Sequence, residues 1–276
     1  MRARLIPAVV ALLVASPFSG PALMAAHAES SPPSSGALPD VVGLRPGITA
    51  QEAYKFLKSY DRVAKIYVSD TPLPPVQDKP VPFAIAMAQD DNAAEKIQAD
   101  LTLPPSKQMV WRVTRRLQFS PDKQTSPQNL IASLRKKYGP ESYMGSGRAP
   151  MLTWYFDEQG QRTTLPGGMN SANCASKFGP TMLLMGVPAS HGLQYLLIQP
   201  LSQSADDPIC RSVVIVSAIM QPAQDQRLIY SLDVVVADLP LETRTHNMTV
   251  EMLANGGAAQ QQRELDRANK REGPKL

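Results

Sequence analysis

Two helix starts with the same capping pattern constrain most strongly what this chain can fold into. Thr49 with Glu52 three residues later forms a capping box, and Thr125 with Gln128 repeats that spacing. The first helix is predicted over about residues 50–60. Its apolar face has the i, i+3, i+4, i+7 spacing of an amphipathic helix and consists of Ala53, Phe56, Leu57 and Tyr60.

The second helix is predicted to carry Pro127 in its first turn and to end at Gly139-Pro140. Its apolar stripe consists of Leu130, Ile131, Leu134 and Tyr138. The two helices therefore mark the beginnings of two related halves.

Strand patterns follow both helices. They cover residues 63–68, 83–88, 97–103 and 109–119 after the first helix, and 151–156, 182–187, 193–199, 213–220 and 228–236 after the second. Residues 213–220 are almost continuously apolar, which predicts a central strand covered on both faces. Residues 71–82 contain five prolines and are expected to form an extended loop.

Sequential strands joined by short turns favour antiparallel meanders over parallel crossovers. The predicted fold class is α+β and mostly β, with two related helix-on-antiparallel-sheet units and a C-terminal helix. The expected divisions are a signal peptide, a flexible Ser/Pro leader, a first unit, a second unit, and a C-terminal helix with a polar tail, at residues 1–28, 29–40, 41–120, 121–240 and 241–276.

The first 28 residues have the pattern of a secretory signal peptide. Arg2 and Arg4 precede the apolar run Leu5–Val14, and Ala26-His27-Ala28 supplies a small-x-small cleavage site. The run is too short to span a bilayer, which needs about 20 residues, and the segment lacks a lipid-anchor cysteine. The expected product is a soluble periplasmic or secreted protein, cleaved after Ala28, with no transmembrane segment.

Cleavage lowers the basic count from 28 to 26 against 24 acidic residues, so the formal net charge falls from +4 to +2. This small charge and the exported location argue against nucleic acid as a partner. Cys174 and Cys210 are the only cysteines, and in an oxidising compartment such a pair predicts one structural disulfide.

Two places in the strands are candidates for a partner surface. Arg112 and Arg116 alternate with apolar residues along 109–119, so they are predicted to form a basic stripe on an exposed sheet face. Tyr155 lies between Trp154 and Phe156, and alternation predicts an exposed Tyr155 anchor beside two core residues. A solvated polar face is the alternative for the arginines.

The stretch GLRPGITAQEAYKFLK, with Gly47-Ile48-Thr49 and Glu52 at its centre, resembles the helix entry of small bacterial envelope proteins. These include the small lipoprotein component of the outer-membrane β-barrel assembly machinery. Tandem helix-plus-sheet units are also similar to the β-lactamase inhibitor protein fold. In the second half, Asp122-Lys123-Gln124 replaces the Pro-Gly of the pattern, so the repeat is partial there. The resemblance implies the tandem fold.

Motifs for known chemistry are scarce. His191 and His246 lack the spacing of zinc ligands and are interpreted as solvated residues. Gly145-Ser146-Gly147 lacks the strand–turn–helix setting of a nucleophile elbow, and Asp90-Asp91 and Asp206-Asp207 are typical of turns. No cofactor or metal is predicted, and a Ser/His/Asp triad assembled in space stays open.

The C-terminal region is helix-prone but poor in apolar residues. Gly256-Gly257 is expected to break or end a helix, and residues 258–271 contain Leu265 as their one strongly apolar residue. A solvated tail and a partner-docking helix are the two interpretations.

The functional prediction is a non-catalytic periplasmic binding or envelope-assembly module with an envelope protein partner. The alternative is a periplasmic hydrolase with an unrecognised Ser/His/Asp site. A cleft that gathers a histidine with Ser and Asp would favour the enzyme, and a broad sheet face would favour the binder. The oligomeric state is left open.

Overall fold

The computed structural model describes residues 37–61, 63–73, 77–88, 94–145, 149–165, 212–224 and 227–269. Several sequence predictions lie outside these residues. They are the signal peptide, most of the leader, the disulfide of Cys174 and Cys210, the turns at 90–91, 146–147 and 206–207, His191, and the strands expected at 182–187 and 193–199.

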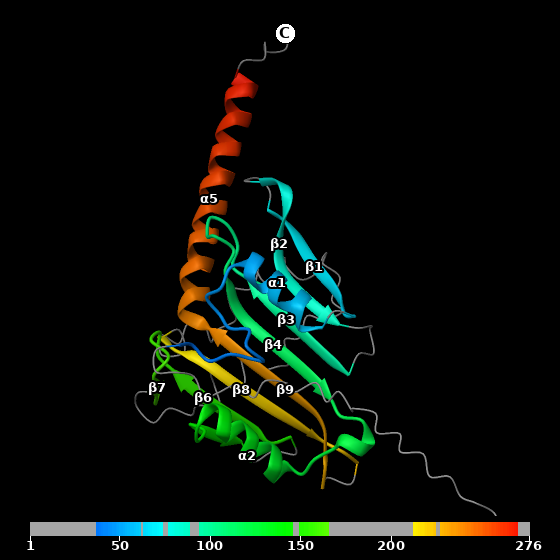
Figure 1. The fold of residues 1–276 in the computed structure, drawn as a ribbon. Helices are drawn as coiled ribbons and strands as arrows, with labels where there is room; N and C mark the ends of the chain where they lie inside the picture. The colour runs from blue at the N-terminus through cyan, green and yellow to red at the C-terminus, as the bar shows by residue number, and fades with distance from the viewer. Residues whose placement is uncertain are drawn as a thin grey trace, which may run out of the picture.

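One antiparallel sheet of nine strands organises the described residues (Figure 1). The elements in chain order are α1 (Ala50–Tyr60), β1 (Lys65–Leu73), β2 (Gln77–Ala88), β3 (Glu95–Leu101), β4 (Val110–Gln118), the short 3-10 helix η1 (Pro121–Lys123), α2 (Pro127–Tyr138), β5 (Tyr143–Gly145), β6 (Met151–Phe156), β7 (Arg162–Thr163), β8 (Val214–Pro222), β9 (Ile229–Asp238) and α5 (Leu239–Asn269). The predicted α+β class is confirmed.

The strand order displays the tandem arrangement. It runs β1-β2-β3-β4-β9-β8-β6-β5, with β7 paired to β6. The helix α1 is thus followed by the meander β1 to β4, and α2 is followed by β5, β6, β8 and β9 with the short β7 beside β6. The last strands of the two units, β4 and β9, pair with each other. The two units share one continuous sheet, in which β1 and β5 occupy the two ends.

The first helix begins as predicted. Glu52 N–H donates to Thr49 Oγ1 at 3.3 Å, and Thr49 N–H donates to the Glu52 carboxylate at 2.8 Å, which completes the capping box. The Thr49 N–H, together with the Thr49 hydroxyl that donates to the same carboxylate at 2.7 Å, lowers the pKa of Glu52. Ala53 and Leu57 are buried against the sheet.

The second helix begins one residue later than the sequence spacing indicates. Ser126 Oγ accepts from Asn129 N–H at 3.3 Å, and Pro127 is the first helical residue. Thr125 is not the cap, because its carbonyl accepts from Ile229 N–H at 2.8 Å and holds it in a bridge to β9. The predicted end at Gly139 is confirmed, with φ of +81° and a hydrogen bond from its N–H to the Arg135 carbonyl.

Both helices cover the same face of the sheet. A single hydrophobic cluster contains Leu57 of α1, Leu134 and Tyr138 of α2, and side chains from both units' strands. Trp154 is fully buried, at 0% exposure, and its ring centroid lies 5.3 Å from that of Tyr138. Its Nε1 donates to the Gly139 carbonyl at 2.8 Å, so the core ties the end of α2 to β6.

The other face of the sheet carries a second, smaller cluster of Tyr155, Val213, Ile215, Val235, Ala237 and Leu239. The prediction of a central, doubly covered strand at 213–220 is confirmed, since Val214, Ile215 and Val216 of β8 are at 0% exposure between β9 and β6.

Two local predictions about strands are wrong. Residues 71–82 were expected to be loop, but β1 extends to Leu73 and β2 begins at Gln77. In 109–119 the alternation is broken by a register shift where Asp100 pairs with Arg112 and Leu101 with Val110. Val110 therefore joins the core cluster on the helix side, and Trp111 packs with the second-face cluster.

The C-terminal helix α5 is a continuous helix of 31 residues. The predicted break at Gly256-Gly257 is wrong, because the helix continues through both glycines. Its first turns lie against the molecule, with Leu239 and Leu241 buried, whereas residues 258–267 are exposed. At 1.5 Å per residue the helix is about 46 Å long, and Figure 1 shows its C-terminal part standing beyond the sheet.

Candidate functional site

The predicted basic stripe is an internal ion-pair system. Arg112 is 5% exposed, and its Nε donates to Asp100 on β3. The other oxygen of Asp100 accepts from Gln98 Nε2 at 2.6 Å. The Arg112 guanidinium also lies 4.8 Å from the centroid of the Trp111 ring. The predicted exposure of Arg112 is therefore wrong, because its charge is compensated by a neighbouring strand inside the structure.

Arg116 has a more open position than Arg112. Its Nε and Nη2 contact Asp233 of β9 at 2.8 and 3.3 Å, and its side chain is 37% exposed. Arg115 points to the helix-covered face and donates through Nε to Glu95 at 2.6 Å. Each arginine of this strand thus has a carboxylate from an adjacent strand.

The predicted exposure of Tyr155 is also wrong, since this residue is 1% exposed. It lies on β6 between β7 and β8 and packs in the second-face cluster. The core assignment of Trp154 and Phe156, at 0% and 2% exposure, is confirmed. Alternation places Tyr155 on the correct face, but that face is covered.

Two buried hydroxyls on the second face were not anticipated from the sequence. Thr153 and Ser217 are cross-strand neighbours on β6 and β8, at 0% and 1% exposure. Within the described part of the chain, neither Oγ atom has a hydrogen-bond partner. Thr114 and Gln98, also buried, lie in the same cross-strand row on β4 and β3, but Val235 of β9 separates them from Ser217.

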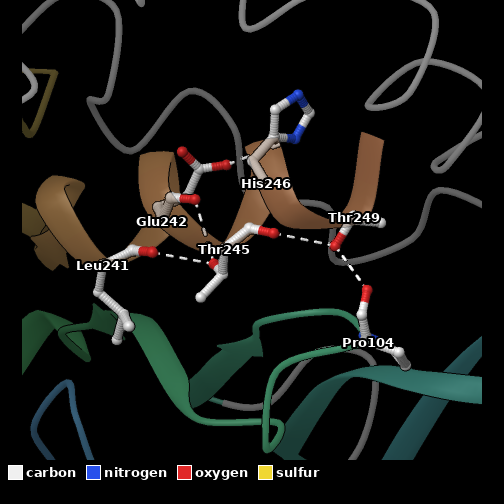
Figure 2. Close-up of polar contacts among 6 residues, drawn as sticks. All are labelled: Pro104, Leu241, Glu242, Thr245, His246 and Thr249. Atoms are coloured by element: carbon white, nitrogen blue, oxygen red, sulfur yellow. Dashed lines mark hydrogen bonds and ion pairs between the residues drawn. The ribbon is translucent and has the colours of Figure 1, made fainter. Parts of the chain in front are cut away.

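The base of α5 contains His246, the one histidine among the described residues (Figure 2). Its Nδ1 lies 4.0 Å from Glu242 Oε1, one helical turn away. Thr245 Oγ1 donates to the carbonyls of Leu241 and Glu242 at 2.9 and 3.1 Å. Thr249 Oγ1 donates to the Pro104 carbonyl at 2.7 Å and to that of Thr245 at 3.0 Å.

This arrangement anchors a helix. Thr245 and Thr249 direct their hydroxyl hydrogens to main-chain carbonyls, whereas a nucleophilic hydroxyl would donate its hydrogen to the base. Figure 2 shows the imidazole of His246 directed away from these two hydroxyls. Within the part of the chain that the structure describes, no three His, Cys, Asp or Glu side chains form a metal-binding group.

Asp238 caps α5 at its buried end. Its Oδ1 accepts from Leu241 N–H at 2.9 Å. Burial raises the pKa of Asp238, and Glu158 adds to that rise while Arg244 and the Leu241 hydrogen bond oppose it. The carboxylate therefore fixes the direction in which α5 leaves β9.

The strands at the two ends of the sheet differ in length. β5 has three residues and β7 two, and both pair with the edge of β6 that lies opposite β8. β1 has nine residues, and among the described strands only β2 pairs with it. An edge strand of this length presents a row of backbone N–H and C=O groups to a partner.

Large apolar side chains accompany this edge. Tyr67 and Val68 of β1 are 43% and 48% exposed, and Val63, just before the strand, is 80% exposed. Tyr67 is paired with Ala86 and Val68 with Ile85 of β2, so the two side chains lie on opposite faces of the sheet. We call residues 63–70 with the outer side of β1 the β1 edge.

No sequence signal marked the β1 edge as special, because a strand's place in the sheet order depends on pairings far along the chain. The exposed Val63–Val68 segment was predicted as a strand, but its terminal position was not.

Among the described residues, no helix combines the length and hydrophobicity that a membrane span requires. No protein-family model, curated protein or solved structure matches this chain.

Proposed function

We propose that this protein is a non-catalytic binding or assembly module of the bacterial periplasm that contacts an envelope protein. The observation that carries the proposal is the distribution of exposed apolar side chains. Of the nine large hydrophobic side chains exposed in the described residues, three belong to the β1 edge and three to α5 (Val63, Tyr67, Val68, Met248, Val250 and Leu265).

Both elements are suited to contact another molecule. β1 is at the end of the sheet, and α5 extends beyond it (Figure 1). An edge strand is a template for pairing with another chain, and such a partner buries the apolar side chains that the edge exposes. The arginines of β4, by contrast, are paired with carboxylates of neighbouring strands, as in Arg112–Asp100 and Arg116–Asp233.

The location is part of the proposal. It rests on the signal-peptide pattern of residues 1–28, with cleavage after Ala28, and on the pair Cys174 and Cys210 as a disulfide. The resemblance of the Gly47–Glu52 segment to small envelope proteins agrees with this compartment.

The test is site-specific photo-crosslinking in intact cells. A photoreactive residue replaces Tyr67, Leu265 or, as a control on the exposed face of α1, Lys55. The expected result is one defined envelope protein crosslinked from position 67 or 265 and absent from position 55. If no position crosslinks to a protein and purified protein hydrolyses ester or amide substrates in a His246-dependent manner, the hydrolase replaces the binding module.

A further inference from the structure

We propose that the β1 edge binds an extended, acidic segment of the partner protein by strand addition, so that the segment becomes a tenth strand of the sheet. This inference rests on the proposed function and specifies its site and its chemistry. Strand addition supplies affinity through main-chain hydrogen bonds and specificity through alternate side chains.

The contrast between equivalent strands supports the site. β1 and β5 hold the same position in the two units: each is the first strand of its unit, and each lies at an outer end of the sheet. β5 is reduced to three residues, which is one way in which proteins prevent unwanted edge pairing. β1 retains nine residues, and its segment Ile66–Ser69 contains neither charge nor proline.

The exposed side chains of Tyr67 and Val68 would contact an added strand on the two faces of the sheet. An added strand places its alternate side chains beside Tyr67 on one face and beside Val68 on the other, because neighbours across strands are about 5 Å apart. Both residues are more than 40% exposed, and an incoming apolar residue on each face would bury them.

Charge specifies the partner further. Pairing of Lys65 with Ala88, Ala88 with Lys96 and Lys96 with Arg116 places Lys65 at the outer end of a cross-strand row in which Arg116 already has Asp233 as its ion-pair partner. Asp233 is the acidic residue that continues the row on β9. Lys65 is the outermost member, so the added strand sets one residue directly beside it, and opposite charges in such pairs are favourable.

A second copy of this chain would not supply that charge. Two copies of β1 can pair antiparallel about a two-fold axis. If the axis passes through Tyr67, Lys65 of one copy faces Ser69 of the other, and if it passes through Val68, Lys65 faces Thr71. Lys65 faces Asp70 only if the axis passes between Tyr67 and Val68. That register requires facing side chains to point to opposite sides of the sheet, which the pleat does not allow. A foreign acidic segment therefore fits better than self-pairing.

The experiment selects nonapeptides from a fully randomised displayed library on the intact mature protein. The enriched peptides are expected to alternate β-branched or aromatic residues, to contain Asp or Glu, and to lack central proline. Their affinity, measured by fluorescence anisotropy, is expected to fall at least tenfold with Val68→Lys. Met144→Lys on β5 is the matched control, because Met144 is also 48% exposed, and affinity there should be unchanged.

A charge reversal tests the chemistry separately. Lys65→Glu should weaken binding of the selected acidic peptides and strengthen binding of their lysine-substituted versions. Circular dichroism and urea unfolding verify that the variants fold, and Tyr67→Lys is the substitute for Val68→Lys.

The inference is overturned if no peptide is enriched, if Val68→Lys and Met144→Lys bind alike, or if the edge supports only a dimer of this chain that Val68→Lys dissolves. If cells yield a crosslinked partner whose binding is unchanged by Val68→Lys, the proposed function stands and the proposal of strand addition at β1 fails.

Discussion

Arg112 and Asp100 place two opposite charges inside the sheet, at 5% and 4% exposure, with Gln98 satisfying the second carboxylate oxygen. A buried pair of this kind need not add stability compared with an apolar pair, but removal of one partner leaves the other charge buried and uncompensated. The pair therefore fixes the pairing of β3 with β4 beside the register shift at Leu101.

We expect Arg112→Ala to lower the free energy of unfolding by about 3–5 kcal/mol, because Asp100 then loses its charge partner. Arg135→Ala is the control, since Arg135 pairs with Glu141 with its side chain 50% exposed, and it should leave the free energy of unfolding nearly unchanged. Urea unfolding measures both. Equal losses in the two variants would contradict a special role for the buried pair.

Leu57 and Thr49 contribute to the same helix in different ways. Leu57→Ala is expected to cost about 2–5 kcal/mol, because it leaves a cavity in the core beneath α1. Thr49→Ala should cost about 1 kcal/mol, because it removes one capping interaction. Chemical denaturation compares them with Lys55→Ala on the exposed face, and a larger loss for Thr49→Ala would argue against this packing.

At the scale of single residues, interactions between residues close in the chain could be predicted from the sequence. The capping box of Thr49 and Glu52 involves residues three apart and follows from the sequence. Thr125 was the wrong cap because Ile229, more than 100 positions further along the chain, holds its carbonyl. Arg112 was assigned to solvent because its partner Asp100 becomes adjacent only through strand register.

Among the elements, α5 has the clearest division between an anchored and an exposed part. Asp238, Thr245 and Thr249 hold its first turns, and Thr249 reaches the Pro104 carbonyl of the β3–β4 connection. Gly256-Gly257 was expected to end the helix, yet a Cβ at Gly257 would meet no atom of the described residues within 4 Å, so none of these residues packs there to redirect the chain.

Asp238→Asn is expected to raise the urea midpoint at pH 7. Burial raises the pKa of Asp238 in the folded protein, so the ionised carboxylate destabilises the fold at neutral pH. Asparagine keeps the capping acceptor without the charge. As pH falls through the raised pKa and then below the ordinary aspartate value of about 4, both states become protonated and the difference should vanish.

The control for this pH series is Asp266→Asn, because Asp266 lies in the exposed part of α5. Its stability should follow that of the unmodified protein at every pH. A gain for Asp238→Asn that persists unchanged at pH 3 would contradict an electrostatic origin.

At the scale of the whole molecule, the two-unit arrangement and the antiparallel order followed from the sequence, because the capping patterns and the strand patterns are local. Which strands would end the sheet did not follow. That property depends on the pairing of β4 with β9, and no local pattern in either strand specifies it. The candidate site was missed for the same reason.

The cysteine pair offers a test of the compartment. Protein released from the periplasm and denatured without reductant is expected to show no titratable thiol, since Cys174 and Cys210 form a disulfide in this proposal. Cys174→Ser should cost about 2–5 kcal/mol of stability. Two free thiols per chain in Ellman titration would remove the disulfide from the proposal.

The pairing of β4 with β9 also has a consequence for how the protein is made. Arg116 and Asp233, which join these strands, are 117 positions apart. At translation rates of about 5–20 residues per second, the first half emerges on the order of ten seconds before its neighbour strand. During that interval β4 has β3 on one side but lacks β9 on the other, so the nascent chain carries an open strand edge that favours aggregation before synthesis is complete.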